Sequence, residues 1–185
     1  MTASPLHVSR LSLHYDTVED RLVLMAVSDE EKAVALHLTR RLTARLINGI
    51  SHLLERSSAL AQRAPLDMRG DVILLEHQRA LTRAETSVRP AGSGAVALGK
   101  ARRSGGAKQA AVPARLVRAV NIATRPAAFD IVLNDQRAAA ARFSASRAEL
   151  HQLLEHLRRV SGSADWALSA DAAWLRQESR ELILN

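Results

Sequence analysis

The sequence predicts an α+β protein made of two halves, each with three antiparallel strands followed by a helix. Two patterns carry this prediction. Short runs of alternating apolar residues are separated by turn residues, and directly after the third run of each half the apolar period changes from two to about 3.6. The spacing is also similar, since 28 residues separate Leu11 from Thr39 and 26 separate Val120 from Ser146. Residue identity between the halves is low, so either a structural duplication or a common local order explains the pattern.

The first half contains three predicted strands, at residues 11–15, 21–28 and 34–38. The second of these is apolar on both faces, which is typical of a central strand. Thr39 is the expected N-cap of a helix that ends before Pro65. The apolar stripe of this helix comprises Leu42, Leu46, Ile47, Ile50, Leu53 and Leu54. A second amphipathic helix is predicted over residues 71–85.

The second half repeats this order, with strands predicted at residues 116–124, 129–133 and 139–143. Ser146 and Glu149 form an S-x-x-E capping box, which satisfies exposed amide groups at a helix start. The helix that follows is expected to end at Gly162. Beyond it, the sequence predicts a short strand at 164–168, a short helix within 169–180 and an apolar tail at 181–184.

Positive charge is concentrated in one part of the chain. Residues 86–129, called the acid-free segment below, contain eight of the 26 Lys and Arg residues and no Asp or Glu. The remaining 18 basic residues are balanced by 19 acidic ones, so the net charge of +7 resides in this segment. Segregated charge indicates an oppositely charged partner, such as a phosphate backbone or an anionic surface.

The sequence predicts three regions. Residues 1–85 form the first half with its extra helix, 86–113 a flexible basic linker, and 114–185 the second half with its tail. Five of the eight glycines lie within residues 91–113, which show no periodicity. Such a composition favours either a segment that extends along a phosphate backbone or a solubilising tether.

Composition excludes several classes of protein. The chain has no cysteine, hence no disulfide framework and no thiolate chemistry, and aromatic residues make up only 3%. No secretory signal is visible, and the longest apolar runs are far shorter than the roughly 20 residues that cross a bilayer. We therefore expect a soluble cytoplasmic protein with no membrane partner.

Candidate catalytic, cofactor and metal sites are weak. Residues 94–101 match the G-x-x-x-x-G-K core of a phosphate-binding loop, but they lack the final Ser or Thr and the flanking strand and helix, which favours chance similarity. His14 and His37 approach across strands either as a solvated pair or as part of a zinc site, for which further ligands are missing. No nucleophile turn is recognisable. We predict no enzyme activity, no cofactor and no metal.

The repeated strand-strand-strand-helix order resembles the plan of PUR-type and Whirly-type single-strand nucleic-acid-binding domains. Those domains have four strands in each repeat, whereas the sequence predicts three here, and none of their residue motifs is matched. The resemblance is to the order of elements and implies a curved sheet presented to a nucleic acid strand.

The predicted function is a binding module that contacts nucleic acid phosphates with little sequence specificity. Arg40, Arg41 and Arg45 fall in the first turns of the helix that Thr39 caps, where positive charge is unfavourable because of the helix dipole. Their presence there indicates either a function or a solvated face whose aliphatic stems cover apolar surface. The alternative is a structural or assembly subunit. It would contact a protein partner, or further copies of itself, through sheet edges and the apolar C-terminal tail. The residues predicted to bind nucleic acid are Arg40, Arg41, Arg45, Lys100, Arg102, Arg103, Lys108, Arg115, Arg118 and Arg125.

Overall fold

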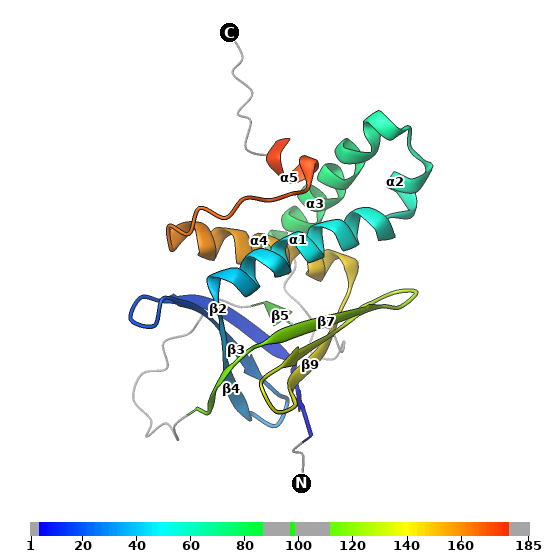
Figure 1. The fold of residues 1–185 in the computed structure, drawn as a ribbon. Coiled ribbons are helices and arrows are strands. Elements are labelled where there is room, and N and C mark those ends of the chain that lie inside the picture. The colour runs from blue at the N-terminus through cyan, green and yellow to red at the C-terminus, as the bar shows by residue number, and fades with distance from the viewer. Residues whose placement is uncertain (1–3, 87–96, 99–111, 178–185) are drawn as a thin grey trace.

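The computed structural model describes residues 4–86, 97–98 and 112–177. Strands and helices alternate in blocks along this part of the chain, as the predicted α+β class requires (Figure 1). The strands are β1 (Leu6–His7), β2 (Arg10–Asp16), β3 (Arg21–Val27), β4 (Ala33–Leu38), β5 (Ala97–Leu98), β6 (Ala114–Leu116), β7 (Ala119–Thr124), β8 (Phe129–Asn134) and β9 (Ala139–Ala145). The helices are α1 (Arg40–Ser57), α2 (Ala59–Arg63), the 3-10 turn η1 (Leu66–Met68), α3 (Arg69–Thr86), α4 (Arg147–Ser163) and α5 (Ala173–Gln177).

Two sheets form the lower part of the molecule in Figure 1, one of four strands in the order β1-β9-β8-β7 and one of five in the order β5-β2-β3-β4-β6. The antiparallel triplets β2-β3-β4 and β7-β8-β9 confirm the predicted strands, and β3 is central as expected. The prediction of three strands in each sheet was wrong. β1, β5 and β6 have only two or three residues, which is too short for a periodic signal.

The two halves exchange their leading strands. β1, at the start of the first half, pairs in parallel with β9 of the second, with Leu6 opposite Ala141. β6, at the start of the second half, pairs in parallel with β4 of the first, with Arg115 opposite Leu36. Each leading strand is followed within a few residues by a long strand of its own half's sheet. The edge of each sheet is therefore completed by the other half.

Each triplet leads directly into a helix, and both caps agree with the prediction. The Thr39 hydroxyl accepts a hydrogen bond from the Leu42 amide at 3.2 Å, and Ser146 forms the full capping box with Glu149. The first helix is interrupted at Ser58, whose hydroxyl caps α2 by accepting from the Ala61 amide. The predicted stop at Gly162 was wrong by one residue, because α4 runs on through it to Ser163.

The core lies between the strands and the layer of helices above them (Figure 1). Leucine, isoleucine, valine and alanine supply most of it, as the low aromatic content requires. Leu36 of β4, Ile50 of α1 and Leu150 of α4 are fully buried. Helix α4 packs against both α1 and α3, so the helices of the two halves share one core.

The predicted strand at residues 164–168 was also wrong. Residues 164–172, called the strap below, lie outside any strand and are fixed at two points by side chains. The indole of Trp166 is 2% exposed and donates to the Asp20 carboxylate at 2.8 Å. Asn48 of α1 donates to the Asp171 carboxylate and accepts from the Asp171 amide. The short α5 confirms a helix within residues 169–180, and the predicted tail at 181–184 lies outside the described residues.

Candidate nucleic-acid interface

Three exposed arginines, Arg40, Arg41 and Arg45, lie in the first turns of α1. Arg41 and Arg45 are one helical turn apart and project from the same side of the helix. The first turn of α1 holds no acidic residue. Within the described part of the chain, none of the three makes an ion pair or a side-chain hydrogen bond. Their positive charges are available to an external anion.

Arg118 lies close to the start of the same helix. The preceding residue, Val117, donates its amide to the His37 carbonyl at 3.0 Å, and Thr39, two residues after His37, caps α1. Arg118 is exposed and, among the described residues, has no carboxylate partner. The pairing of β6 with β4 thus places the backbone of Arg118, a cation of the acid-free segment, near the start of α1. We call Arg40, Arg41, Arg45 and Arg118 the α1 arginine cluster.

The carboxylate of Asp20 interacts electrostatically with Arg40 of this cluster. The Tyr15 hydroxyl and the Trp166 indole donate to Asp20, and these bonds, followed by the positive charge of Arg40, lower the pKa of the Asp20 carboxyl. Asp20 therefore stays ionised, with its oxygen engaged by two neutral donors. Among the described residues, the side chain of Arg40 donates no hydrogen bond to Asp20 or to any other group.

Two other predicted cations, Arg115 and Arg125, have carboxylate partners. Arg115 donates to Asp135 at 3.0 Å. The pKa of the Asp135 carboxyl is lowered mainly by the amides of Ala138 and Arg137 and then by Arg115. Arg125 is paired with Asp130, whose carboxyl pKa is lowered first by the hydrogen bond from Ser144 and then by Arg125. A phosphate must compete with these carboxylates.

The remaining predicted residues, Lys100, Arg102, Arg103 and Lys108, lie outside the described residues, as does most of the 94–101 string. His14 and His37 lie on one face of the five-stranded sheet but do not pair. Each is opposite Val23 of the intervening β3, which separates them by two strand spacings, about 10 Å. In the described ranges, no group of three or more His, Asp or Glu side chains could hold a metal ion.

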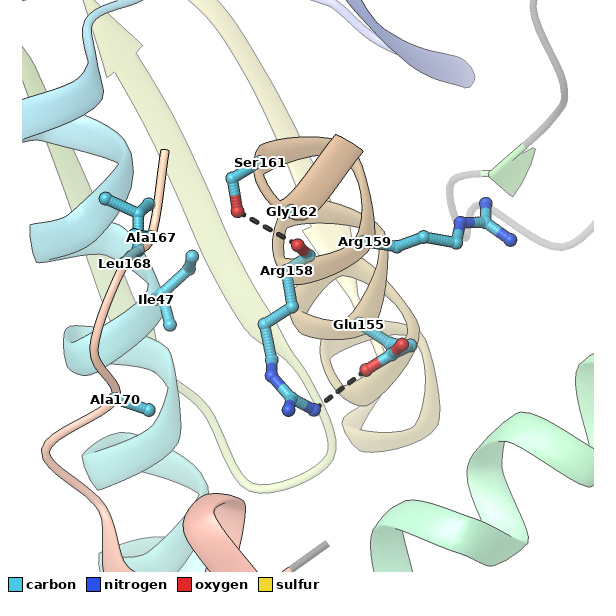
Figure 2. A pocket seen from close by; sticks show the side chains of 9 residues that line it. All are labelled: Ile47, Glu155, Arg158, Arg159, Ser161, Gly162, Ala167, Leu168 and Ala170. Carbon is cyan, nitrogen blue, oxygen red and sulfur yellow. Dashed lines mark hydrogen bonds and ion pairs between the residues drawn. The ribbon is translucent and has the colours of Figure 1, made fainter. Parts of the chain in front are cut away.

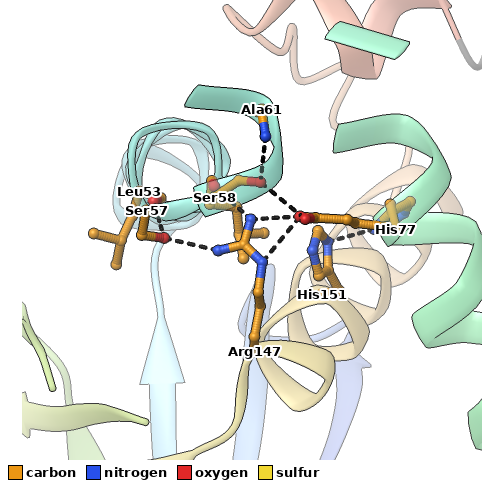
Figure 3. A network of polar contacts seen from close by, with 9 residues as sticks. Leu53, Ser57, Ser58, Ala61, His77, Arg147 and His151 are labelled. Atoms are coloured by element: carbon orange, nitrogen blue, oxygen red, sulfur yellow. Dashed lines mark hydrogen bonds and ion pairs between the residues drawn. The ribbon is translucent and has the colours of Figure 1, made fainter. Parts of the chain in front are cut away.

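A partly buried ionic network was missed by the sequence reasoning (Figure 3). The guanidinium of Arg147, at the start of α4, donates to the Glu76 carboxylate of α3 through Nε at 3.0 Å and Nη2 at 2.7 Å. It also donates to the Ser57 hydroxyl and the Leu54 carbonyl of α1, and Ser58 donates to Glu76. One arginine thus connects three helices, in a role that is structural.

Two buried histidines lie next to this network. Nδ1 of His77 and Nδ1 of His151 are 3.1 Å apart, and Trp174 of α5 lies edge-on to both rings. Since one ring must donate and the other accept, the two Nδ1 atoms share one proton. Burial, then the charges of His77 and Arg147, lower the pKa of His151 to about 3. His156, also on α4, lies with its Nδ1 3.1 Å from the Gln152 carbonyl.

A pocket of about 330 Å³ lies between α1, α4 and the strap (Figure 2). Ile47, Leu168 and Ala170 give it an apolar wall, whereas the guanidinium of Arg158 is paired with Glu155 at 3.0 Å. Figure 2 shows Arg159 pointing away from Ile47 and from the apolar wall. Arg158 is already paired with Glu155, and Arg159 points away from the apolar wall (Figure 2). The pocket therefore has little positive charge with which to bind an anionic ligand.

No protein-family model matches the chain, and neither a curated protein nor a solved structure does. No helix of the described residues is long and apolar enough to span a bilayer.

Of the arrangements described above, the α1 arginine cluster has the most specific chemistry. Guanidinium groups without a carboxylate partner recognise phosphate or carboxylate oxygens through paired N–H donors.

Proposed function

We propose that this protein binds nucleic acid through phosphate contacts, without catalysis and with little sequence preference. The observation that carries the proposal is the α1 arginine cluster: four exposed arginines, three in the first turns of α1 and one on the backbone that pairs beside the start of this helix, without a carboxylate hydrogen-bond partner among the described residues. Protein surfaces ordinarily intersperse both signs of charge. A cluster of one sign that includes a cation of the acid-free segment is a favourable site for a polyanion.

In this mechanism the cations have two roles. The α1 arginine cluster is held on a capped helix and a strand end, so it makes ordered phosphate contacts that fix the position of the nucleic acid. Lys100, Arg102, Arg103 and Lys108 add long-range attraction and release counterions when they meet phosphates. Arg115 and Arg125 contribute less, because each must first leave its carboxylate.

We further infer that the two halves are an internal structural repeat joined by a flexible basic segment. The exchange of leading strands supports it, since β1 and β6 take equivalent positions beside β9 and β4. With the leading strand included, each half has four strands before its helix, the number found in the PUR-type and Whirly-type repeats whose order the sequence resembles. This agreement supports a nucleic-acid partner through fold analogy, which is weaker support than the arginine cluster.

The test is fluorescence anisotropy with labelled single-stranded and double-stranded oligonucleotides across a salt series. The variant Arg40→Ser/Arg41→Ser/Arg45→Ser removes three cations of the cluster. The matched control Arg56→Ser/Arg63→Ser/Arg79→Ser removes the same charge from exposed positions at the other end of α1, on α2 and on α3. A second variant changes Lys100, Arg102, Arg103 and Lys108 to Ser.

We expect the cluster variant to bind more weakly and to lower the slope of log K against log salt by about 2 for single strands and about 3 for duplexes. The control should leave most of that slope intact. Absence of binding by the unmodified protein at low salt would refute the proposal. Equal losses in the cluster variant and its control would show that net charge, rather than the cluster, attracts the nucleic acid.

A further inference from the structure

One sheet edge differs from the other three. The edges of the two sheets are formed by β1, β7, β5 and β6. β1 and β5 have two residues and β6 has three, which is a common way of protecting a sheet from unwanted strand pairing. β7 has six residues, pairs with β8 on one side and, in the described part of the chain, has no strand on its other side.

The alternation of hydrogen bonds identifies the backbone groups at this open edge. Arg125 donates its amide to the Ala128 carbonyl at 2.8 Å, which marks these two residues as a hydrogen-bonded pair of the hairpin. In an antiparallel ladder every second residue bonds to the partner strand, so Ala123 and Asn121 bond to β8. The amides and carbonyls of Val120, Ile122 and Thr124 therefore point away from β8, toward the open edge.

The side chains of β7 do nothing to block this edge. Its sequence, Ala-Val-Asn-Ile-Ala-Thr, has no charged residue and no proline, which are the usual protective residues. Val120 and Ile122 are only half-buried, although their neighbours Leu133 and Ile131 on β8 are fully buried. The apolar side chains of β7 thus lie at the rim of the core and are only partly covered.

We propose that β7 of a second copy of this chain completes the edge, in antiparallel pairing about a two-fold axis through Ile122. In this register Ile122 lies opposite its own equivalent, and Val120 lies opposite Thr124 of the other chain. All outward-pointing backbone groups of β7 then find partners, since each of these pairs exchanges two hydrogen bonds. Every pair on the core side joins two β-branched side chains, which favours strand pairing.

The charges at the ends of β7 tolerate this arrangement. Arg118 lies one residue before the strand and Arg125 one residue after it, so the two-fold brings Arg118 of one chain near Arg125 of the other. Arg125 is already neutralised by Asp130. On the outer face, Asn121 meets Ala123 of the other chain, a neutral pair of exposed residues. The dimer joins two four-stranded sheets edge to edge and is isologous.

The first test is sedimentation velocity of nuclease-treated protein at high salt over about 1–200 µM, with no nucleic acid present. The unmodified chain should dimerise. Ile122→Pro removes an amide that has no partner among the described residues, and this variant should be monomeric throughout with an unchanged circular dichroism spectrum. Asn121→Lys/Ala123→Lys, which places lysines opposite one another, should weaken the dimer about 2- to 30-fold. Asn121→Glu/Ala123→Lys, which pairs opposite charges, should restore it.

The second test fixes the register and uses the absence of cysteine in this chain. Residues 121 and 123 form a non-hydrogen-bonded cross-strand pair in the proposed dimer, with Cα atoms about 4.5 Å apart, close enough for a disulfide. Asn121→Cys mixed with Ala123→Cys should oxidise to a covalent heterodimer faster than either variant alone forms a homodimer. An unmodified chain that stays monomeric at 200 µM, or equal crosslinking in all three samples, would overturn the proposal. Neither result bears on nucleic-acid binding, which is measured separately.

Discussion

Removing the carboxylate of Glu76 tests whether the Arg147 network holds the helices together. The side chains of Arg147 and Glu76 are 28% and 19% exposed, so water reaches both only partly. Glu76→Leu leaves the guanidinium without its ionic partner while filling most of the vacated volume. Loss of one partner of a fully buried pair destabilises a protein by about 3–5 kcal/mol. After discounting for partial exposure, we expect a loss of about 2–3 kcal/mol.

Denaturation by urea, followed by circular dichroism, measures this change as a free energy of unfolding. For a chain of this length the same loss lowers the melting temperature by about 5–10 °C. Arg147→Met should destabilise by a similar amount, because among the described residues it leaves Glu76 with the Ser58 hydroxyl as its one remaining donor. The double variant should recover about 1–2 kcal/mol relative to the sum of the two single variants, since neither charge then remains unpaired.

Two results would refute this reasoning. A loss below about 0.5 kcal/mol for Glu76→Leu would place the pair in the class of surface salt bridges that contribute little. Strict additivity in the double variant would show that the two side chains stabilise the fold independently, despite the 2.7 Å contact between them.

Two further stability predictions concern α4. The pKa of His151 is about 3 in the fold, below its value near 6.5 in the unfolded chain. Between these two pH values the unfolded state binds a proton that the folded state does not. The free energy of unfolding therefore falls as the pH drops from about 6.5 toward 3. This group should lower the free energy of unfolding by up to about 1.4 kcal/mol for each pH unit. His151→Leu should reduce the slope of the free energy of unfolding against pH, and an unchanged slope would show that His151 is not the group responsible. Ser146→Ala should destabilise by about 1 kcal/mol in urea, whereas the exposed Ser163→Ala at the other end of α4 should change stability by less than about 0.5 kcal/mol, and equal losses would count against the capping box.

Local signals predicted the long elements well. The apolar period and the caps at Thr39 and Ser146 depend on residues three or four apart, so they are visible in the sequence. The strand predicted at 164–168 failed because the position of Trp166 is set by Asp20, 146 residues away.

The polar networks needed tertiary information. Arg147 and Glu76 are 71 residues apart, and no spacing in the sequence connects them. A partial signal did exist for His77, which lies on the stripe formed by Ile73 and Ala80 and is therefore on the buried face of α3. Similarly, Arg118 joined the α1 arginines through the parallel pairing of β6 with β4, which a three-residue strand cannot reveal in advance.

The exchange of leading strands has a consequence for how the chain folds during synthesis. β1 leaves the ribosome before its partner on β9, which lies 135 residues later in the chain. At about 5–20 residues per second, β1 waits roughly 7–27 s before its partner exists. Because such distant contacts also slow folding, β1 stays unpaired until β9 has been synthesised, and the β4 edge stays open until β6 has been synthesised. Synthesis and folding of this protein are thus coupled through its shortest strands.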